Sequence, residues 1–414
     1  MISYKKAEKI LLKSKIKIKD ELILSDRSLN RVCSEDIYSP INYPSGNNAA
    51  FDGYAINSQD TRNLNKKNLR KFKILKTIAA GDNPKVKNVK KFQCVEIMTG
   101  ALIPKQFDTI IPIEQIKFYE KKKFILVDQK IRKNNHVRFL GSDYLKNDIV
   151  IKKGTIINPS YILAFKSLGI KKITVKKKPT IIFFSTGNEI TNKEKINTWQ
   201  VRNSNSHYIK SLSDSFLFNF INGGTLKDND VKTFTKIIKK NINSKVDIVI
   251  TSGAVSAGKF DFVPNVIKKF NSSKFFKGVA IRPGKPILFA KFKKKEKVFF
   301  GLPGNPLSSA ACFRFFVYPF ILNILGIKKE LSFKALLKKK FQKKKDFTRF
   351  LKGKISSTKN GKIKIEILKG QESFKIKSFT QSNVWGVFKA GQSVFKKGEL
   401  IDCHSSIGNN KIFF

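Results

Sequence analysis

The sequence predicts a multidomain protein of the α/β plus β class. The chain has 414 residues, too many for one hydrophobic core, and 41% of them are hydrophobic, which is enough for several cores. Short apolar runs separated by turns precede residue 140, strands alternate with helices over 179–326, and alternating strands return after about residue 328. These changes indicate a β-rich unit, an α/β unit with parallel strands and a second β-rich unit.

The first part of the chain predicts a short helix and a small β-rich domain. Residues 3–14 have amphipathic helical spacing, and the turn-rich stretch 44–50 is typical of a crossing between two units. From Asp52 to about residue 139, short apolar runs alternate with polar turns, as in a small β domain. A further unit begins near Gly141 and contains a helix from Pro159 to Gly169.

In the α/β region, residues 179–185 and 246–251 are continuous apolar runs, as expected for strands buried on both faces. Helical spacing from Ile209 to Phe220 predicts a helix that ends at Gly223 and Gly224. Further helices are expected at Val231–Ile242, at Val263–Phe270 and after Pro306, with strands at 286–290 and 298–300. In the last region, the Asn360-Gly361 pair before alternating isoleucines predicts a β-hairpin.

Charge is the most unusual feature of the composition. Lys and Arg number 83 against 30 Asp and Glu, which gives a formal net charge of +53. Such an excess is typical of nucleic-acid-binding proteins, but here the lysines are spread along the whole chain and define no patch. Together with the abundance of Phe, Ile and Asn, this spread favours a bias of the genome, so we expect no specific nucleic-acid partner. Nucleic-acid binding stays open as an alternative.

The cysteine pattern and the apolar stretches indicate a cytoplasmic protein. The cysteines form no CxxC pair, which argues against a zinc site or a disulfide framework; they are Cys33, Cys94, Cys312 and Cys403. The N-terminus lacks the continuous apolar core of a signal peptide. The most apolar stretch, 307–327, is interrupted by Arg314 and Asn323, which favours a buried or interface helix over a membrane span.

Glycine- and proline-containing turns follow or join the predicted strands of the α/β region. They occupy 185–189, 251–261, 282–286 and 302–306. Because ligands bind at the carboxyl ends of strands in open α/β sheets, and glycine lets backbone N–H groups approach an anion, these turns predict a ligand site. The charged residues among them point to a phosphate-bearing ligand held with a divalent cation: Glu189, Asp228, Asp261, Arg282 and Lys285.

Residues 253–259 also match the GxxxxGK pattern of a P-loop. The pattern fails at the next position, because Phe260 stands where a Ser or Thr hydroxyl should coordinate magnesium. A P-loop-like nucleotide-binding protein is therefore the weaker alternative.

The motifs of this chain resemble those of the bacterial molybdopterin molybdenumtransferases, and the resemblance covers nearly the whole length. In the α/β region it rests on FSTGNEI, TSGAVSAGKFD, RPGKP and LPGNP, which begin at residues 184, 251, 282 and 302. Outside that region it rests on NNAAFDGYA at 47–55, IMTGALIP at 97–104 and VRFLGSDY at 137–144. A non-catalytic molybdopterin-binding scaffold, like the receptor-clustering relatives of this family, stays open as an alternative function.

The resemblance implies four domains. They are an elongated linking domain (1–44 and 140–176), a small β-rich domain (45–139), a molybdopterin-binding α/β three-layer domain (177–327) and a C-terminal β-barrel (328–414). It also implies a homodimer that inserts molybdate into adenylated molybdopterin in a Mg²⁺-dependent reaction that releases AMP. The substrate would be handed over by the molybdopterin adenylyltransferase, with no membrane involved.

The resemblance further implies roles for individual residues. The catalytic group comprises Asp52, Thr99, Asp143, Glu189, Asp228 and Asp261, of which Glu189 and Asp261 would bind the metal. The substrate-binding group comprises Arg138, Ser185, Gly187, Ser252, Gly253, Ser256, Arg282, Lys285, Pro303 and Pro306. The first three catalytic residues would come from the second subunit of the dimer. From the sequence alone, Asp52 and Asp143 are explained equally well as turn or strand-end residues.

Three positions depart from the family pattern. Ala254 replaces a glycine, so either its backbone lies in an ordinary region or the turn is altered. Arg282 stands where many relatives carry lysine, and residues 371–373 read QES instead of the usual Gly-Ser. None of these changes removes a charged residue from the predicted site.

Overall fold

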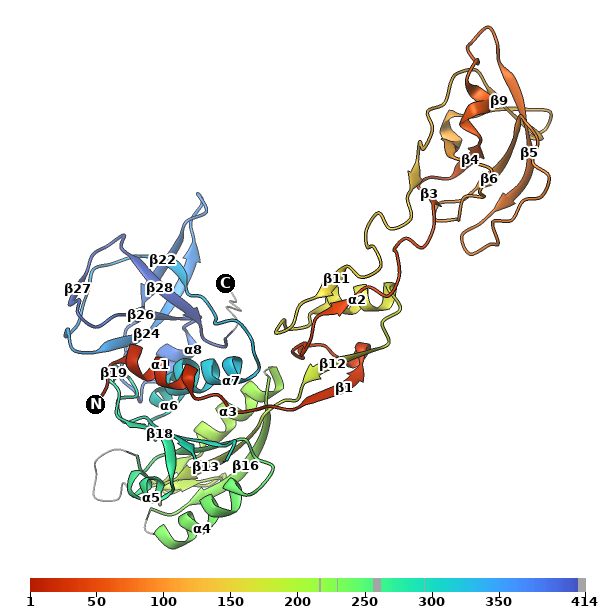
Figure 1. Cartoon of the computed structure of the whole chain (residues 1–414). Coiled ribbons are helices and arrows are strands. Elements are labelled where there is room, and N and C mark those ends of the chain that lie inside the picture. Colours follow the sequence, from red (N-terminus) through yellow and green to blue (C-terminus); the bar gives the residue numbers. More distant parts are fainter. Residues whose placement is uncertain (216, 229, 256–261, 294, 409–414) are drawn as a thin grey trace.

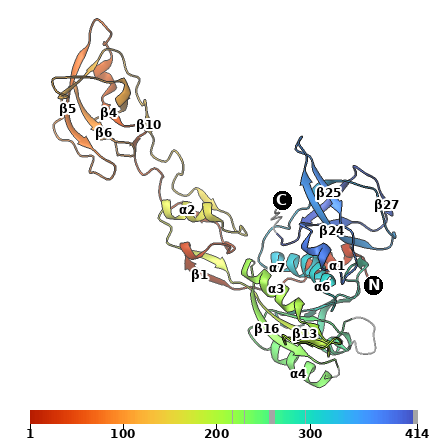
Figure 2. The ribbon, with the colours of Figure 1, turned by 180° about the vertical axis from the view of Figure 1, so that it is seen from behind.

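The computed structural model describes residues 1–414 except 216, 229, 256–261, 294 and 409–414. The molecule is elongated: a compact body carries a small distal domain on a narrow connection, and the reverse view shows the same separation (Figures 1 and 2). The predicted α/β plus β architecture is confirmed.

The connection between body and distal domain is built from short antiparallel strand pairs. β1 (Asp20–Leu24) pairs with β12 (Lys172–Lys176), and β2 (Ile37–Tyr38) pairs with β11 (Ile149–Ile151). Helix α2 (Pro159–Ser167) covers them; it begins where the Asn158 side chain accepts the Tyr161 N–H and Pro159 occupies the first turn. Two segments far apart in the sequence therefore form one linking unit.

The distal domain contains a six-stranded sheet. Its strands, in spatial order, are β7 (Thr109–Pro112), β4 (Gly53–Ile56), β6 (Gln93–Ile97), β5 (Arg70–Ile78), β9 (Phe124–Val127) and β8 (Lys117–Tyr119). At the base of this domain β3 (Asn48–Ala49) pairs with β10 (Val137–Arg138). The chain therefore enters and leaves the distal domain on two adjacent strands. Tyr54, Phe72 and Ile125 fill the core, as the alternating apolar pattern predicts.

The α/β domain also contains a six-stranded sheet. Its spatial order is β16 (Asn219–Leu226), β13 (Thr180–Thr186), β17 (Ile248–Ser252), β21 (Val298–Leu302), β20 (Leu288–Phe292) and β18 (Ser272–Lys277). The first four strands run parallel, and the last two add an antiparallel edge.

Helices cover both faces of this sheet (Figure 1). Phe183 points to the face covered by α3 (Ser204–Ser215), α6 (Pro306–Cys312) and α7 (Tyr318–Ile324). Its neighbour Phe184 points to the opposite face, covered by α4 (Val231–Ile242) and α5 (Val263–Lys269). Since successive residues of β13 are buried on opposite sides, the continuous apolar pattern of that strand is explained.

One sequence prediction in this domain is wrong. The helix expected to run through Phe220 ends at Ser215, and Asn219–Leu226 form the edge strand β16, with Phe220 opposite Ile181. The glycines read as a helix stop lie within that strand. A Cβ atom at Gly223 would lie 2.3 Å from the Phe184 ring, so glycine is required there for close packing. Phe216 lies outside the described residues.

The C-terminal domain is a closed barrel. Its strands are β24 (Thr348–Ser357), β25 (Ile363–Ile367), β22 (Phe333–Leu337), β28 (Leu400–Ser405) and β26 (Val384–Phe388), and β26 pairs back with β24. A small pair, β23 (Phe341–Gln342) and β27 (Val394–Phe395), lies beside it. The hairpin predicted at Asn360-Gly361 joins β24 to β25, and Gly361 has a φ of +74°.

The apolar stretch after Pro306 is a core helix. Pro306–Ile324 is long and apolar enough to span a membrane, but 89% of its most apolar window is buried inside the molecule. Phe313, Phe315 and Phe316 are buried within the chain, so of the two predicted roles, buried or interface helix, the structure supports the first.

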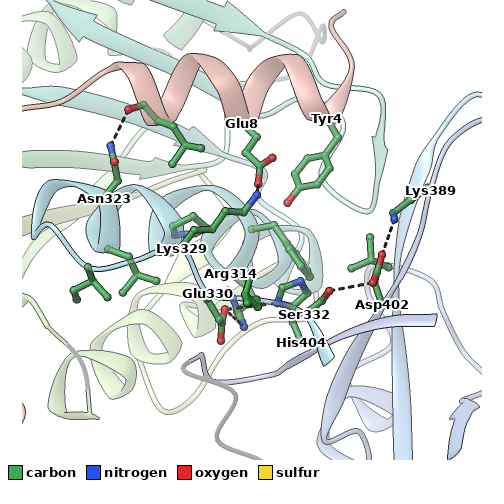
Figure 3. Close-up of a pocket in the computed structure, with 17 residues that line it drawn as sticks. Tyr4, Glu8, Arg314, Asn323, Lys329, Glu330, Ser332, Lys389, Asp402 and His404 are labelled. Carbon is green, nitrogen blue, oxygen red and sulfur yellow. Dashed lines mark hydrogen bonds and ion pairs between the residues drawn. The ribbon is translucent and has the colours of Figure 1, made fainter. Parts of the chain in front are cut away.

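Ion pairs fix the barrel to this helix and to α1 (Tyr4–Lys13), around a cavity of about 310 Å³ (Figure 3). Arg314, which is 4% exposed, pairs with Glu330 at 2.7 Å, and its Nε donates to the Ser405 carbonyl at 2.8 Å. Glu8 of α1 pairs with Lys329 at 2.7 Å. A buried guanidinium is costly without partners, so the bonds from Arg314 to Glu330 and Ser405 hold the helix and the barrel in one arrangement.

Asp402, which lines the same cavity, adds a pH-dependent contribution within the barrel. Burial alone would raise its pKa, but hydrogen bonds from Lys334, Lys389 and Ser332 outweigh burial and lower the pKa to about 2. The ionised carboxylate therefore stabilises the fold above about pH 4, and this contribution is lost as the pH falls through about 2.

We predict that Asp402→Asn lowers the free energy of unfolding by at most about 2 kcal/mol at neutral pH. Solvent screens the charges of the exposed Lys334 and Lys389, which reduces the effect below that value. The difference between wild type and variant should shrink as the pH is lowered from 5 to 2. Denaturant unfolding of both proteins across that range measures it. A difference that is independent of pH would contradict this role of Asp402.

Candidate active site

A cavity of about 460 Å³ lies at the carboxyl ends of the parallel strands β13, β17 and β21. Its wall includes Ser185 and Thr186 from the end of β13, Gly253 from the turn after β17, and Pro303 and Pro306 from the turn after β21. Three of the four predicted turns therefore meet at one edge of the sheet, and the fourth, 282–286, reaches the same cavity through Pro286. This is the edge at which open α/β sheets bind ligands.

Buried polar side chains cross-link these turns. The Asn205 amide donates to the Ser252 hydroxyl at 2.6 Å and to the Gly304 carbonyl at 2.8 Å. The Ser185 hydroxyl donates to the Asn203 amide oxygen at 2.8 Å. The Asn203 amide nitrogen, in contrast, is buried without a hydrogen-bond partner among the described residues. The network holds the ends of β13, β17 and β21 at fixed distances from one another.

Sequence reasoning missed Asn203 and Asn205. They precede and begin α3, directly after the short strand β15 (Val201–Arg202), which pairs with β14 (Ile190–Thr191). This segment contains no glycine or proline and follows no long apolar strand, the two features that mark the predicted turns. Another pattern could have identified Asn203 and Asn205: residues 203–206 are all Asn or Ser, and such polar residues between a strand and a helix are typical of a helix start.

Glycines permit the close approach of these turns. A Cβ atom at Gly253 would lie 2.3 Å from the Thr186 carbonyl oxygen, and the residue has a φ of +110°. A Cβ atom at Gly187, φ +152°, would lie 2.7 Å from a Glu189 carboxylate oxygen. Gly253 therefore requires glycine because of the Thr186 backbone, whereas at Gly187 the Glu189 side chain could move and the positive φ is what favours glycine.

Ala254 resolves the question that the sequence left open. Its φ is +52°, so the turn keeps the left-handed conformation that glycine adopts easily and alanine does not. The backbone of this turn has the left-handed geometry expected for glycine, and Ala254 adopts it at the cost of conformational strain.

We predict that Ala254→Gly raises the free energy of unfolding by up to about 1 kcal/mol, because relief of the left-handed strain exceeds the entropy that glycine adds to the unfolded chain. Chemical denaturation of wild type and variant measures the change. Ala254→Val is the opposite control and should destabilise the protein. A Gly variant less stable than wild type would show that the turn is not strained.

Two predicted acidic residues reach this cavity. Glu189 and Asp228 line it, and the Asp228 backbone N–H is held by the Asn188 side chain at 3.3 Å. Asp261 and Ser256 lie outside the described residues. Within the part of the chain that the structure describes, no group of three or more His, Cys, Asp or Glu side chains converges in a way that could hold a metal ion.

The predicted cations lie on the neighbouring turn, against the barrel. Pro286 lines the cavity, whereas Arg282 and Lys285 precede it on the same turn. β19 (Ile281–Arg282) pairs with the barrel strand β24, which places Arg282 beside Arg349, and Arg282 lies 4.8 Å from the Phe347 ring. Burial and the nearby Arg282 charge lower the pKa of Arg349, whose Nε has no hydrogen-bond partner among the described residues. Two adjacent guanidiniums of like charge favour a bound anion.

The remaining predicted residues lie on the distal domain and the linking unit. The Asp52 carboxylate accepts the Thr99 N–H at 2.6 Å and the Thr99 hydroxyl at 2.7 Å, and these bonds lower the pKa of Asp52. Arg138 donates to the Ala50 carbonyl at 3.5 Å, and the Asp143 side chain is exposed. Figure 1 shows the distal domain far from β13, whose end borders the cavity, so a single chain does not bring the two groups together.

Family comparisons cover most of the chain. Residues 2–169 match the model of the MoeA N-terminal region (domain I and II), 182–323 the probable molybdopterin binding domain, and 334–405 the MoeA C-terminal region (domain IV).

Named relatives match over nearly their full lengths. A molybdopterin molybdenumtransferase from Staphylococcus epidermidis is 31% identical over 407 residues, covering 97% of this chain and 94% of that protein. One from Staphylococcus aureus is 30% identical over 383 residues, covering 91% and 89%. The crystal structure of the molybdopterin biosynthesis MoeA protein from Pyrococcus horikosii has a TM-score of 0.83 at 27% identity, covering 99% of this chain and all of that one.

Proposed function

Because the chain belongs to the MoeA family of molybdopterin molybdenumtransferases, and is therefore a transferase of molybdenum cofactor biosynthesis, we propose that it inserts molybdate into adenylated molybdopterin and releases AMP. Two Mo–S bonds would form while one molybdate oxygen leaves as water with the two thiol protons. A second water would add across the pyrophosphate bond, which leaves one phosphate on the molybdopterin and the other on AMP. The cavity at the ends of β13, β17 and β21 is the single observation that carries this proposal.

The cavity suits such a ligand in size and chemistry. Its volume of about 460 Å³ lies within the range of small-molecule sites, and its wall alternates backbone turns with Ser, Thr and Asn side chains. We assign contacts with the pterin and phosphate to Ser185 and Gly253 on this wall and to Gly187 and Ser252, which adjoin wall residues in the chain. The Ser185 and Ser252 hydroxyls and the Gly187 and Gly253 N–H groups already donate within the protein, so these residues would contribute shape and acceptor oxygens. Pro303 and Pro306 stiffen one wall, which keeps the site preorganised.

Anion binding is assigned to the cationic group beside the barrel. The substrate phosphates and molybdate are all negative and repel one another, so the reaction needs fixed positive charge near both. Arg282 and Lys285 would supply it, and Arg349 adds a second guanidinium beside Arg282.

Magnesium dependence rests on the acidic residues. Carboxylate oxygens are the ligands that Mg²⁺ prefers, so Glu189 and Asp228 on the cavity wall fit this ion. We assign the ion to Glu189 and Asp261, with Asp228 as a further carboxylate. When bound, the cation would offset the negative charge that builds up on the cleaved phosphate.

A homodimer would complete the site. Asp52, Thr99, Arg138 and Asp143 would then act on the cavity of the second subunit, because none of them lines the cavity of its own chain and the distal domain lies apart from the α/β sheet (Figure 1). Leu22, Tyr38, Leu145 and Leu163 of the linking unit are at least half exposed. Such an apolar surface among lysines is typical of a protein contact.

A cytoplasmic location is part of the proposal. All four cysteines are free and buried, so the fold needs no oxidising compartment. Adenylated molybdopterin would be received there from the molybdopterin adenylyltransferase.

The first test of the function is AMP release from adenylated molybdopterin by purified protein, with molybdate and Mg²⁺ and with each omitted. Arg282→Ala and Lys285→Ala should raise KM about 10- to 100-fold, because each removes charge-assisted bonds to an anion. Glu189→Ala should lower kcat by a similar factor. Lys239→Ala, on the exposed side of α4, is the control and should behave as wild type.

No AMP release by a folded protein that still binds the substrate would contradict the transferase reaction proposed here. That outcome would favour the non-catalytic scaffold. AMP release without molybdate would instead indicate a simple hydrolase.

The composite site predicts complementation between inactive variants. Asp52→Ala and Glu189→Ala each damage every site of their own homodimers. If the chains are unfolded and refolded together in equal amounts, half of the dimers combine one of each and contain one intact site. The mixture should therefore recover about a quarter of wild-type activity. Recovery of none would mean that Asp52 and Glu189 do not act across subunits.

A further inference from the structure

A buried lysine lies in the barrel beneath the candidate site. Lys352, on β24, is 2% exposed. Its ammonium group has three N–H donors, and Nζ donates to the carbonyl oxygens of Gly370 at 2.7 Å, Glu372 at 3.3 Å and Lys375 at 3.3 Å. Since burying an unpaired charge is very costly, this complete set of acceptors is what allows a lysine at that position.

All three acceptors belong to one segment, residues 368–376, which contains no helix or strand. The same segment is tied to the Lys352 backbone through Gln371, whose side chain accepts the Lys352 N–H at 3.0 Å and donates to the Lys352 carbonyl at 2.9 Å. Ser378 donates to the carbonyl groups of Gly370 and Lys375 at 2.6 and 3.1 Å. One backbone bond, from the Lys375 N–H to the Glu372 carbonyl at 3.2 Å, is internal to the segment. The other bonds described here link the segment to β24 and to Ser378, so these two elements set most of its conformation.

The segment contacts α6, and the helix that follows the segment contacts α3; both α6 and α3 begin at the cavity. The Leu307 N–H, next to the cavity residue Pro306, donates to the Ser373 carbonyl at 3.3 Å. Phe379 of α8 (Lys377–Thr380), which follows the segment, packs edge-on against Tyr208 of α3 at 6.0 Å. A shift of the segment would thus move the start of α6 and press on α3.

We propose that Lys352 is a positioning residue of the candidate site: its ammonium group holds residues 368–376 against the turn at 302–306, and so fixes the barrel side of the cavity. The activity part of this inference rests on the proposed function. The effect on the segment itself does not.

The electrostatic surroundings make this contact sensitive to pH. Burial lowers the pKa of Lys352 to about 8; Glu372 of the segment opposes the shift, and Lys375 adds to it. On the neighbouring strands, β26 places Trp385 opposite Lys352 and has no titratable side chain, and Glu366 of β25 is paired with Lys338. A neutral amine has only two N–H donors, so one carbonyl loses its partner above about pH 8.

The sign of the two pH effects differs. Because the pKa in the folded state lies below the ordinary value for lysine, the neutral form is favoured by folding, and the fold gains stability as the pH rises through about 8. The hold on the segment weakens over the same interval. Stability and positioning can therefore be separated experimentally.

The test compares wild type with Lys352→Met, Lys352→Arg and the control Lys354→Met, which alters an exposed lysine two residues along the same strand. The rate of amide hydrogen exchange in residues 368–376 measures how firmly the segment is held, and the rate of AMP release measures the activity of the candidate site. At pH 7, Lys352→Met should speed exchange about tenfold and lower kcat about tenfold. Lys352→Arg, which stays charged, should restore both, and Lys354→Met should change neither.

Wild type needs no substitution for the second part of the test. Relative to Lys352→Arg at the same pH, its segment should exchange several-fold faster at pH 9 than at pH 7, and its kcat should fall with an apparent pKa near 8. This comparison keeps the proposal testable if Lys352→Met fails to fold.

The outcomes distinguish the two proposals. Segment exchange that is unchanged in Lys352→Met, or in wild type between pH 7 and 9, overturns the role of Lys352 whatever the activity. Faster exchange with wild-type kcat and KM overturns the link to the site. Faster exchange in a series in which even wild type releases no AMP supports the hold on the segment and overturns the proposed function.

Discussion

The parallel pairing of β13, β17 and β21 is the constraint on which the rest of the molecule depends. Strands that run the same way end at the same edge, so the turns after them must meet there. Backbone groups freed at the ends of those strands need partners, and the amide of Asn205 supplies them by bridging the second and third turns. The cavity is thus a consequence of the topology, and the polar network gives it a fixed shape.

The sequence predicts the parts of this arrangement that local pattern determines. Continuous apolar runs predict β13 and β17, and the glycine-containing turns directly after these runs predict where the strands end. Local pattern misled at Phe220, because three residues at helical spacing continued into a strand whose identity depends on pairing with β13. Glycine at 223 is explained only by the Phe184 ring against it, which is a long-range contact.

Residues that owe their place to tertiary structure could not be found in this way. Asn203 and Asn205 belong to no motif considered, and their position follows from the way α3 begins at the edge of the sheet. The conformation of Ala254 could not be decided either, because the same residue could sit in an ordinary or a strained turn until its φ was known. The pairing of Arg282 with Arg349 requires β19 to join the barrel sheet, which no local signal indicates.

The barrel is joined to the α/β domain by a buried charge, the guanidinium group of Arg314. Arg314 lies within a core helix and yet bonds to the barrel through Ser405 and to Glu330. Separating the two domains would break these buried, charge-assisted bonds, and a guanidinium that stayed buried without them would cost several kcal/mol. The two domains therefore behave as one body, and a loop anchored on the barrel can hold a turn of the α/β domain in place. The distal domain is joined by two-stranded pairs alone and shares no such buried charge with the body among the contacts that the structure describes. In the homodimer proposed above, this asymmetry would leave the distal domain, which carries Asp52, able to reach the cavity of the second subunit.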